Sequence, residues 1–231
     1  MAQADTKAQN SLMAKSLQEL LLNSTPLPFV IKQSFSETLF ETIAIRNLKI
    51  QNLKYHQRRV EHTFRDYFHK TTKVDLEQVI NDYLQNFSLK KESLYRLKFT
   101  YNSRGVVGMK HSLYNKKVIN NFLLLEIPDL EYPFKYSNRE CFDMLQKNFK
   151  ADEFIIVKNG YITDTTIANI ALYHQKLKIW HTPKNTLLNG TTRERLLEDK
   201  RIFTANIHYC DLENYSKIAL LNAMIGFDTV N

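Results

Sequence analysis

The fold is decided by residues 152–198, DEFIIVKNGYITDTTIANIALYHQKLKIWHTPKNTLLNGTTRERLLE. Short apolar runs bounded by turn signals are typical of buried strands, and they predict strands at residues 154–157, 167–173 and 177–180. Asn159 and Gly160 both tolerate positive φ, so they predict a tight hairpin turn after the first of these strands. Pro183 has no N–H to donate to a ladder, and the last strand is expected to break at Thr182 and Pro183.

The period of the pattern then changes from two residues to that of a helix. Leu196 and Leu197 fall on one side of a helix that is expected to begin near Thr191, with Arg193 and Arg195 facing elsewhere. The hydrophobic pattern therefore predicts that a loop leads from the strands directly into a helix.

The start of this predicted helix carries a glycine and two hydroxyl residues, Gly190, Thr191 and Thr192. Free backbone N–H groups, two hydroxyl donors and the positive end of the helix dipole together make a cradle for a phosphate. An ordinary helix N-cap has the same residue types. On spacing alone, both interpretations stay open.

Three motifs in this stretch resemble those of the class IV aminotransferases, the fold-type IV enzymes that use pyridoxal 5'-phosphate (PLP). They are GYITD at residues 160–164 with Asn169 following, the Thr-Pro pair at 182–183, and LNGTTR at 188–193. The family includes branched-chain and D-amino acid aminotransferases and 4-amino-4-deoxychorismate lyase. The resemblance favours the phosphate cradle over the simple cap.

Composition sets broad limits. A chain of 231 residues with 43% hydrophobic residues can bury a sizeable core, and it is expected to be globular. Its two cysteines, Cys141 and Cys210, predict neither a disulfide framework nor a metal site and fit a reducing cytoplasm. The net charge of +8 comes from scattered lysines and arginines, so we expect no nucleic-acid partner, and no segment is apolar enough to predict a membrane span.

The N-terminal half is predicted to begin with a helix at residues 12–22, followed by a strand at 36–45. That strand carries Phe-Glu-Thr-Ile at 40–43, which resembles a family motif whose preceding glycine pair is replaced here by residues 36–39. Thr38, in this replaced segment, is a candidate substrate contact implied by the resemblance.

An amphipathic helix is predicted at residues 52–70, and its segment HQRRV at 56–60 resembles a family motif. The resemblance implies that Arg59 binds the cofactor phosphate, which a guanidinium can grip with two charge-assisted bonds. His56 is expected to be a packing or capping residue. A strand is predicted where aromatic and polar residues alternate at 95–101, and Arg96 on its polar face is a second candidate substrate contact.

Further elements are predicted around this half: a helix at 74–87, and strands at 106–109 and 117–127 in the same sheet as 95–101. Residues 128–133 predict a linker. The following residues, FKYSNR at 134–139, resemble the family motif whose lysine carries the cofactor through a Schiff base, which implies that role for Lys135. Asn138 and Arg139 are expected to open a helix running to about residue 148.

The remaining elements are a strand at 202–207, a helical turn at 211–215 and a final strand at 216–224. The end of that strand resembles a small, polar family loop whose backbone contacts the phosphate or the substrate, which implies a cofactor contact for Asn222 and Ala223. The resemblance further implies that Asp164, at a position where most members have glutamate, accepts the N–H of the cofactor ring, with Asn169 beside it.

The resemblance implies an α/β (α+β) architecture of two lobes with PLP between them. The expected divisions are a helical extension at 1–24, a small lobe at 25–127, a linker at 128–134 and a larger cofactor lobe at 135–231. It also implies a homodimer in the cytoplasm that acts on a small anionic, amino-acid-like substrate.

Three functions remain open. The Lys-x-x-Asn-Arg pattern and the Asn-Ala-Met ending favour a lyase that converts 4-amino-4-deoxychorismate to 4-aminobenzoate and pyruvate, and Ala168 stands where branched-chain aminotransferases carry glutamate. An aminotransferase acting on branched-chain or D-amino acids is the alternative. A catalytically degenerate binding module is the third, because of the altered glycine pair and Asp164.

Overall fold

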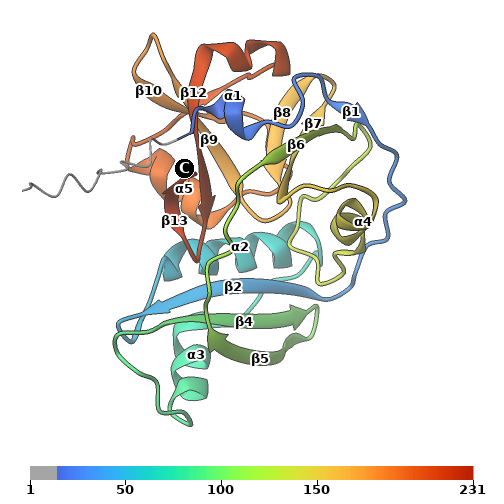
Figure 1. The fold of residues 1–231 in the computed structure, drawn as a ribbon. Helices are drawn as coiled ribbons and strands as arrows, with labels where there is room; N and C mark the ends of the chain where they lie inside the picture. The colour runs from blue at the N-terminus through green and yellow to red at the C-terminus, as the bar shows by residue number, and fades with distance from the viewer. Residues whose placement is uncertain (1–14, 231) are drawn as a thin grey trace, which may run out of the picture.

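The protein is described by a computed structural model that covers residues 15–230, a mixed α/β structure with three sheets (Figure 1). One sheet, at the bottom of the view, has the order β3 (Lys49–Ile50), β2 (Leu39–Arg46), β4 (Leu94–Asn102), β5 (Gly105–Leu113). Leu97, Phe99 and Tyr101 alternate on the buried face of β4. They pack into one core with α2 (Leu53–Asp66) and α3 (Leu76–Leu84).

The second sheet has the order β1 (Leu27–Pro28), β6 (Phe122–Glu126), β7 (Glu153–Lys158), β8 (Tyr161–Thr165). Strands β6 and β7 are parallel, and the connection between them contains α4 (Glu140–Asn148). Leu123 and Leu125 of β6 face the core shared with α2, whereas Phe122 and Leu124 face a second core. Burial on both faces explains why β6 and β7 are continuous apolar runs.

The third sheet has the order β11 (Phe203–Ala205), β10 (Ile179–Pro183), β9 (Asn169–His174), β12 (Tyr215–Asn222), β13 (Gly226–Thr229). Helix α5 (Thr191–Glu198) packs Leu196 against Ala219 and Leu221 of β12. A 3-10 helix, η1 (Tyr209–Asn214), precedes β12. The second and third sheets lie together in the upper part of Figure 1, with α2 between them and the first sheet.

Several predicted elements are confirmed. Strand β7 covers 154–157, Asn159 and Gly160 form the hairpin turn with φ of 51° and 81°, and α4 runs from Glu140 to Asn148. Helix α5 begins at Thr191 with Leu196 buried, as its period predicts.

Other predictions are wrong. Strand β6, predicted within the sheet of β4, pairs with β7 instead, because its two apolar faces need cover on both sides. Strand β10 includes Pro183 as its last residue, where a missing N–H costs least. Strand β12 is not the last strand, since β13 follows it as an antiparallel partner. Arg193, expected only to face elsewhere than Leu196 and Leu197, is itself buried: its guanidinium donates to Thr182 Oγ1 and Pro183 O.

The N-terminal segment packs on the body of the protein from residue 15 onward. Helix α1 (Leu17–Leu20) is one turn closed by a capping box between Ser16 and Glu19, and its two leucines enter the second core. Gln18 donates from Nε2 to the carbonyls of Leu212 and Tyr215. Residues 12–14 of the predicted helix lie outside the described part, and the division of the chain into lobes stays a prediction.

Candidate active site

One cleft, with a cavity volume of about 120 Å³, is lined by residues from β2, α2, the segment 132–142, and three loops: the β8–β9 loop, the turn before α5 and the turn after β12. Of the residues that the sequence singles out, this cleft is lined by Arg59, Lys135, Asp164, Asn169, Gly190, Thr191, Asn222 and Ala223. Segments far apart in sequence therefore meet at one site.

The three other singled-out residues do not line the cleft. Thr192 is fully buried at the start of α5. Thr38 is half-buried at the start of β2, where its carbonyl accepts from Ser137 N–H. Arg96 is exposed on β4. The substrate roles of Thr38 and Arg96 stay predictions, with no cleft contact to support them.

Lys135 is held at the cleft wall by its backbone, because Phe40 N–H donates to its carbonyl. Its ammonium group lies 4.7 Å from the centre of the Phe40 ring. Desolvation, reinforced by the positive charges of Arg59 and Arg139, lowers the pKa of Lys135 to about 7. A large fraction of this amine is therefore neutral, and nucleophilic, at neutral pH.

The Asp164 carboxylate lies in the same cleft and accepts three hydrogen bonds. Oδ1 accepts from Asn169 Nδ2 at 2.7 Å, and Oδ2 accepts from the N–H groups of Leu187 and Leu188 at 2.8 and 3.0 Å. Burial raises its pKa to about 6, although these donors and Arg193 act in the opposite direction. At neutral pH this residue is a buried anion, ready to accept an N–H.

Asn169 and Gly190 pack so closely that the two residue types depend on each other. A Cβ at position 190 would lie 1.9 Å from Asn169 Oδ1. The Asn169 amide in turn donates to both Asp164 and the Leu188 carbonyl. Glycine is therefore required at 190 to let Asn169 tie the strand of Asp164 to the loop before α5.

Arg59 reaches the cleft from α2 and is held by Glu41, a fully buried carboxylate on β2. Arg59 Nε donates to Glu41 Oε1 at 2.8 Å, Nη2 donates to Oε2, and Nη1 donates to Asn189 O at 3.2 Å. Burial would raise the pKa of Glu41, but Arg59 and a hydrogen bond from His56 outweigh it and lower the pKa to about 2. His56 is thus a buried partner of this ion pair.

The N-terminus of α5 fits an anion. Its N-cap is Gly190, which has no side chain to occupy the first N–H groups. The buried hydroxyl of Thr192 has no hydrogen-bond partner within residues 15–230. Arg59 lies beside this turn through its bond to Asn189. A phosphate group would satisfy these donors.

Sequence reasoning gave no role to three residues that the structure brings into the site. Glu41 holds Arg59, Thr42 lines the cleft, and Arg139 lines it from the start of α4. The signal for Glu41 was present: on a strand that alternates, it falls on the same face as Leu39 and Ile43, which predicts a buried acid that needs a cation.

A family model for class IV aminotransferases matches residues 38–230. The chain belongs to the class IV aminotransferase family. It is 35% identical over 191 residues to an uncharacterized protein from Haemophilus influenzae, covering 81% of this chain and 98% of that one. The family consists of enzymes, and the site described above is its candidate active site.

Solved structures agree with the fold. A crystal structure of a candidate 4-amino-4-deoxychorismate lyase from Haemophilus somnus is 33% identical, with a TM-score of 0.75, covering 84% of this chain and 99% of that one. A hypothetical aminotransferase from Mycobacterium tuberculosis in its PLP-bound form shares the fold at 16% identity, with a TM-score of 0.66 and coverage of 84% and 79%. No helix within residues 15–230 is long and apolar enough to cross a membrane.

Proposed function

We propose that this protein binds PLP and converts 4-amino-4-deoxychorismate to 4-aminobenzoate and pyruvate. The observation that carries the proposal is the convergence of three groups on one cleft: the Lys135 amine, the Asp164 carboxylate and the N-terminus of α5. These match the aldehyde, the ring nitrogen and the phosphate of PLP. The likeness to the candidate lyase from Haemophilus somnus, which covers 99% of that chain, favours the lyase reaction.

The residues present fit the cofactor. Arg59, Gly190, Thr191 and the unpartnered hydroxyl of Thr192 would hold the phosphate, and Asp164 would accept the ring N–H. PLP supplies an electron sink that stabilises negative charge on a substrate carbon.

Lys135 has two tasks that its environment suits. Its lowered pKa keeps the amine available to bond to the cofactor aldehyde. The same amine would also be positioned in the cleft to take a proton from a substrate carbon and to return it, because its pKa of about 7 lies near the working pH.

The lyase reaction balances without a second substrate. One C–H bond of the ring and the C–O bond to the enolpyruvyl group break, the ring becomes aromatic, and the departing group takes up a proton as pyruvate. An aminotransferase, by contrast, needs a keto acid to accept the amino group. This difference separates the two reactions in one assay.

The first experiment tests the cofactor. The protein incubated with PLP is treated with borohydride and digested, and mass spectrometry should locate a reduced PLP adduct on Lys135. The Lys135→Ala variant should show none. A wild-type protein that takes up no PLP would favour the binding-module alternative.

The second experiment tests the reaction. With 4-amino-4-deoxychorismate and no keto acid, we expect equal amounts of 4-aminobenzoate and pyruvate. Amino-group transfer that requires a keto acid, with no pyruvate release, would contradict the lyase and favour an aminotransferase for branched-chain or D-amino acids.

We further propose that the enzyme acts in the cytoplasm as a homodimer on a small anionic, amino-acid-like substrate. The excess of basic residues, with a net charge of +8, suits such a substrate. Light scattering at several protein concentrations should give twice the mass of one chain, and the mass of a single chain throughout would contradict the dimer.

A further inference from the structure

We propose that Arg139 binds a carboxylate of the substrate, so that the cleft recognises molecules with an amine at one end and a carboxylate at the other. This proposal rests on the proposed function for the amine, which would react where Lys135 lies. It adds a substrate-binding residue that neither the cofactor nor the reaction itself requires.

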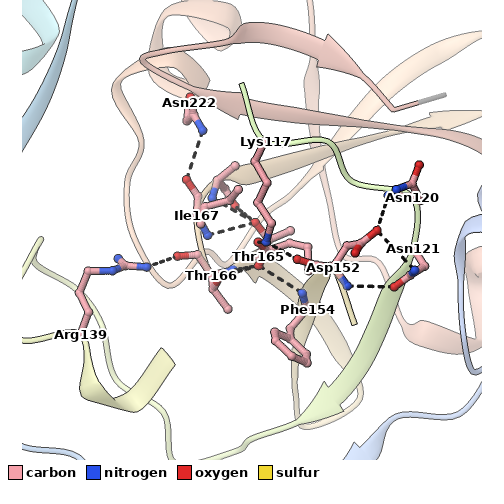
Figure 2. Close-up of polar contacts among 12 residues, drawn as sticks. Lys117, Asn120, Asn121, Arg139, Asp152, Phe154, Thr165, Thr166, Ile167 and Asn222 are labelled. Atoms are coloured by element: carbon pink, nitrogen blue, oxygen red, sulfur yellow. Dashed lines mark hydrogen bonds and ion pairs between the residues drawn. The ribbon is translucent and has the colours of Figure 1, made fainter. Parts of the chain in front are cut away.

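Arg139 is placed at the cleft wall by the start of α4, where it is the N-cap residue. Its guanidinium lies 4.7 Å from the centre of the Phe142 ring. Nη2 donates to the Thr166 carbonyl at 2.5 Å, and Nη1 reaches the Tyr132 hydroxyl only at 3.5 Å. Figure 2 shows the side chain extended toward Thr166. These contacts fix the plane of the guanidinium.

The charge of Arg139 is not neutralised by any ion pair within residues 15–230. The other arginine of the cleft, Arg59, is paired with the buried Glu41. In the described part of the chain, these two hydrogen bonds use two of the five N–H donors of Arg139 and leave the other three without a partner. A half-buried cation in a cleft, with donors to spare, is suited to an anion, and the fork of a guanidinium matches a carboxylate.

Thr166, whose carbonyl accepts the hydrogen bond from Arg139, is itself held in place. Glu153 is fully buried, and its Oε1 accepts from Thr166 N–H at 3.1 Å and from Thr166 Oγ1. Lys117 lies 3.7 Å from the other oxygen of Glu153. In Figure 2, Arg139 reaches Thr166 from the left of the view, whereas Lys117 comes from above. Arg139 is therefore held in place before a ligand arrives, which reduces the entropy cost of binding.

Lys135 and Arg139 lie four residues apart and line the same cleft. Their charges interact, because Arg139 contributes to the lowered pKa of Lys135. A ligand whose amine approaches Lys135 can thus place its carboxylate at Arg139. Both 4-amino-4-deoxychorismate and 4-aminobenzoate carry the two groups at opposite ends of a ring.

The test compares two ligands that differ only in charge, 4-aminobenzoate and its neutral amide, 4-aminobenzamide. Their affinities for the PLP-bound protein are measured by calorimetry. A charge-assisted hydrogen bond is worth about 1.5–3 kcal/mol, so the wild type should bind the acid about ten- to hundredfold more tightly than the amide. Arg139→Gln should lose that preference, and Arg139→Lys should keep part of it.

The matched control is Arg104→Gln, which removes one positive charge from an exposed position outside the cleft. It should keep the full preference for the acid. The proposal is overturned if the wild type shows no preference for the acid, or if Arg139→Gln retains it. Thermal melting of each variant identifies any that fail to fold, in which case Arg139→Lys against the control decides.

This outcome is separate from that of the lyase assay. An acid preference that depends on Arg139, without pyruvate release, would support the carboxylate site and refute the lyase. Pyruvate release with an unchanged KM in Arg139→Gln would support the lyase and refute the carboxylate site.

Discussion

The contact between Gly190 and Asn169 makes a strong prediction about stability. In Gly190→Ala, the new Cβ would lie 1.9 Å from Asn169 Oδ1, whereas ordinary contact begins near 3.4 Å. Asn169 must therefore move by roughly 1.5 Å. The backbone of Gly190, with φ of −78° and ψ of 136°, is accessible to alanine, so the displaced amide is the whole cost.

The magnitude follows from the two hydrogen bonds that the displacement breaks. Asn169 Nδ2 donates to the Asp164 carboxylate at 2.7 Å and to the Leu188 carbonyl at 2.8 Å. A bond to a charged group is worth about 2 kcal/mol and a neutral one about 1 kcal/mol. Gly190→Ala and Asn169→Ala should each lower the free energy of unfolding by about 3 kcal/mol, since both remove the same bonds.

The double variant, Gly190→Ala with Asn169→Ala, tests whether the two residues depend on each other. With the amide already absent, the alanine at 190 meets no obstacle, so the pair should cost about 3 kcal/mol rather than about 6 kcal/mol. Urea denaturation at pH 7 measures all four proteins. If the double variant costs the sum of the single variants to within about 0.5 kcal/mol, the two residues are independent and the reasoning is wrong.

Three further predictions concern the charges and hydroxyls of the site. The rate of PLP uptake by the cofactor-free protein should rise with pH around a midpoint near 7, because uptake needs the neutral Lys135 amine, and Arg139→Gln should shift the midpoint upward in stopped-flow measurements. Because the pKa of Glu41 is lowered from 4.5 to about 2, its ionised form contributes about 3 kcal/mol to the free energy of unfolding above pH 4.5, and this contribution is lost as the pH falls toward 2. Glu41→Gln should abolish this pH dependence in acid denaturation and leave Arg59 buried without its partner. Thr192→Val should leave the stability of the cofactor-free protein unchanged, since its hydroxyl has no partner, but weaken PLP affinity in equilibrium titration.

Much of the structure of residues 152–198 could be predicted from the sequence because its signals are local. The hairpin at Asn159 and Gly160 needs only two residues that tolerate positive φ, and both adopt it. The start of α5 at Thr191 follows from a change of period. The order of the family motifs likewise identifies Lys135, Asp164 and Gly190 as site residues, and the structure shows that all three line one cleft.

What the sequence could not supply was the partner of each buried group. The prediction that residues 117–127 form a strand in the sheet of β4 is wrong, because an apolar run indicates that both faces of a strand are buried but does not indicate which strand lies beside it. For Arg193 the helical period indicates only a side other than that of Leu196 and Leu197, and it cannot show that Thr182 and the Pro183 carbonyl lie within hydrogen-bond reach.

The sequence by itself determined the hairpin at Asn159 and Gly160, the start of α5 and the order of the family motifs. Only the tertiary structure decided that Glu41 neutralises Arg59, whereas Arg139 lines the cleft with no ion-pair partner among residues 15–230. The physical reason is distance in the chain: local conformation depends on neighbouring residues. Charge pairing and desolvation depend on groups that folding alone brings within hydrogen-bond reach.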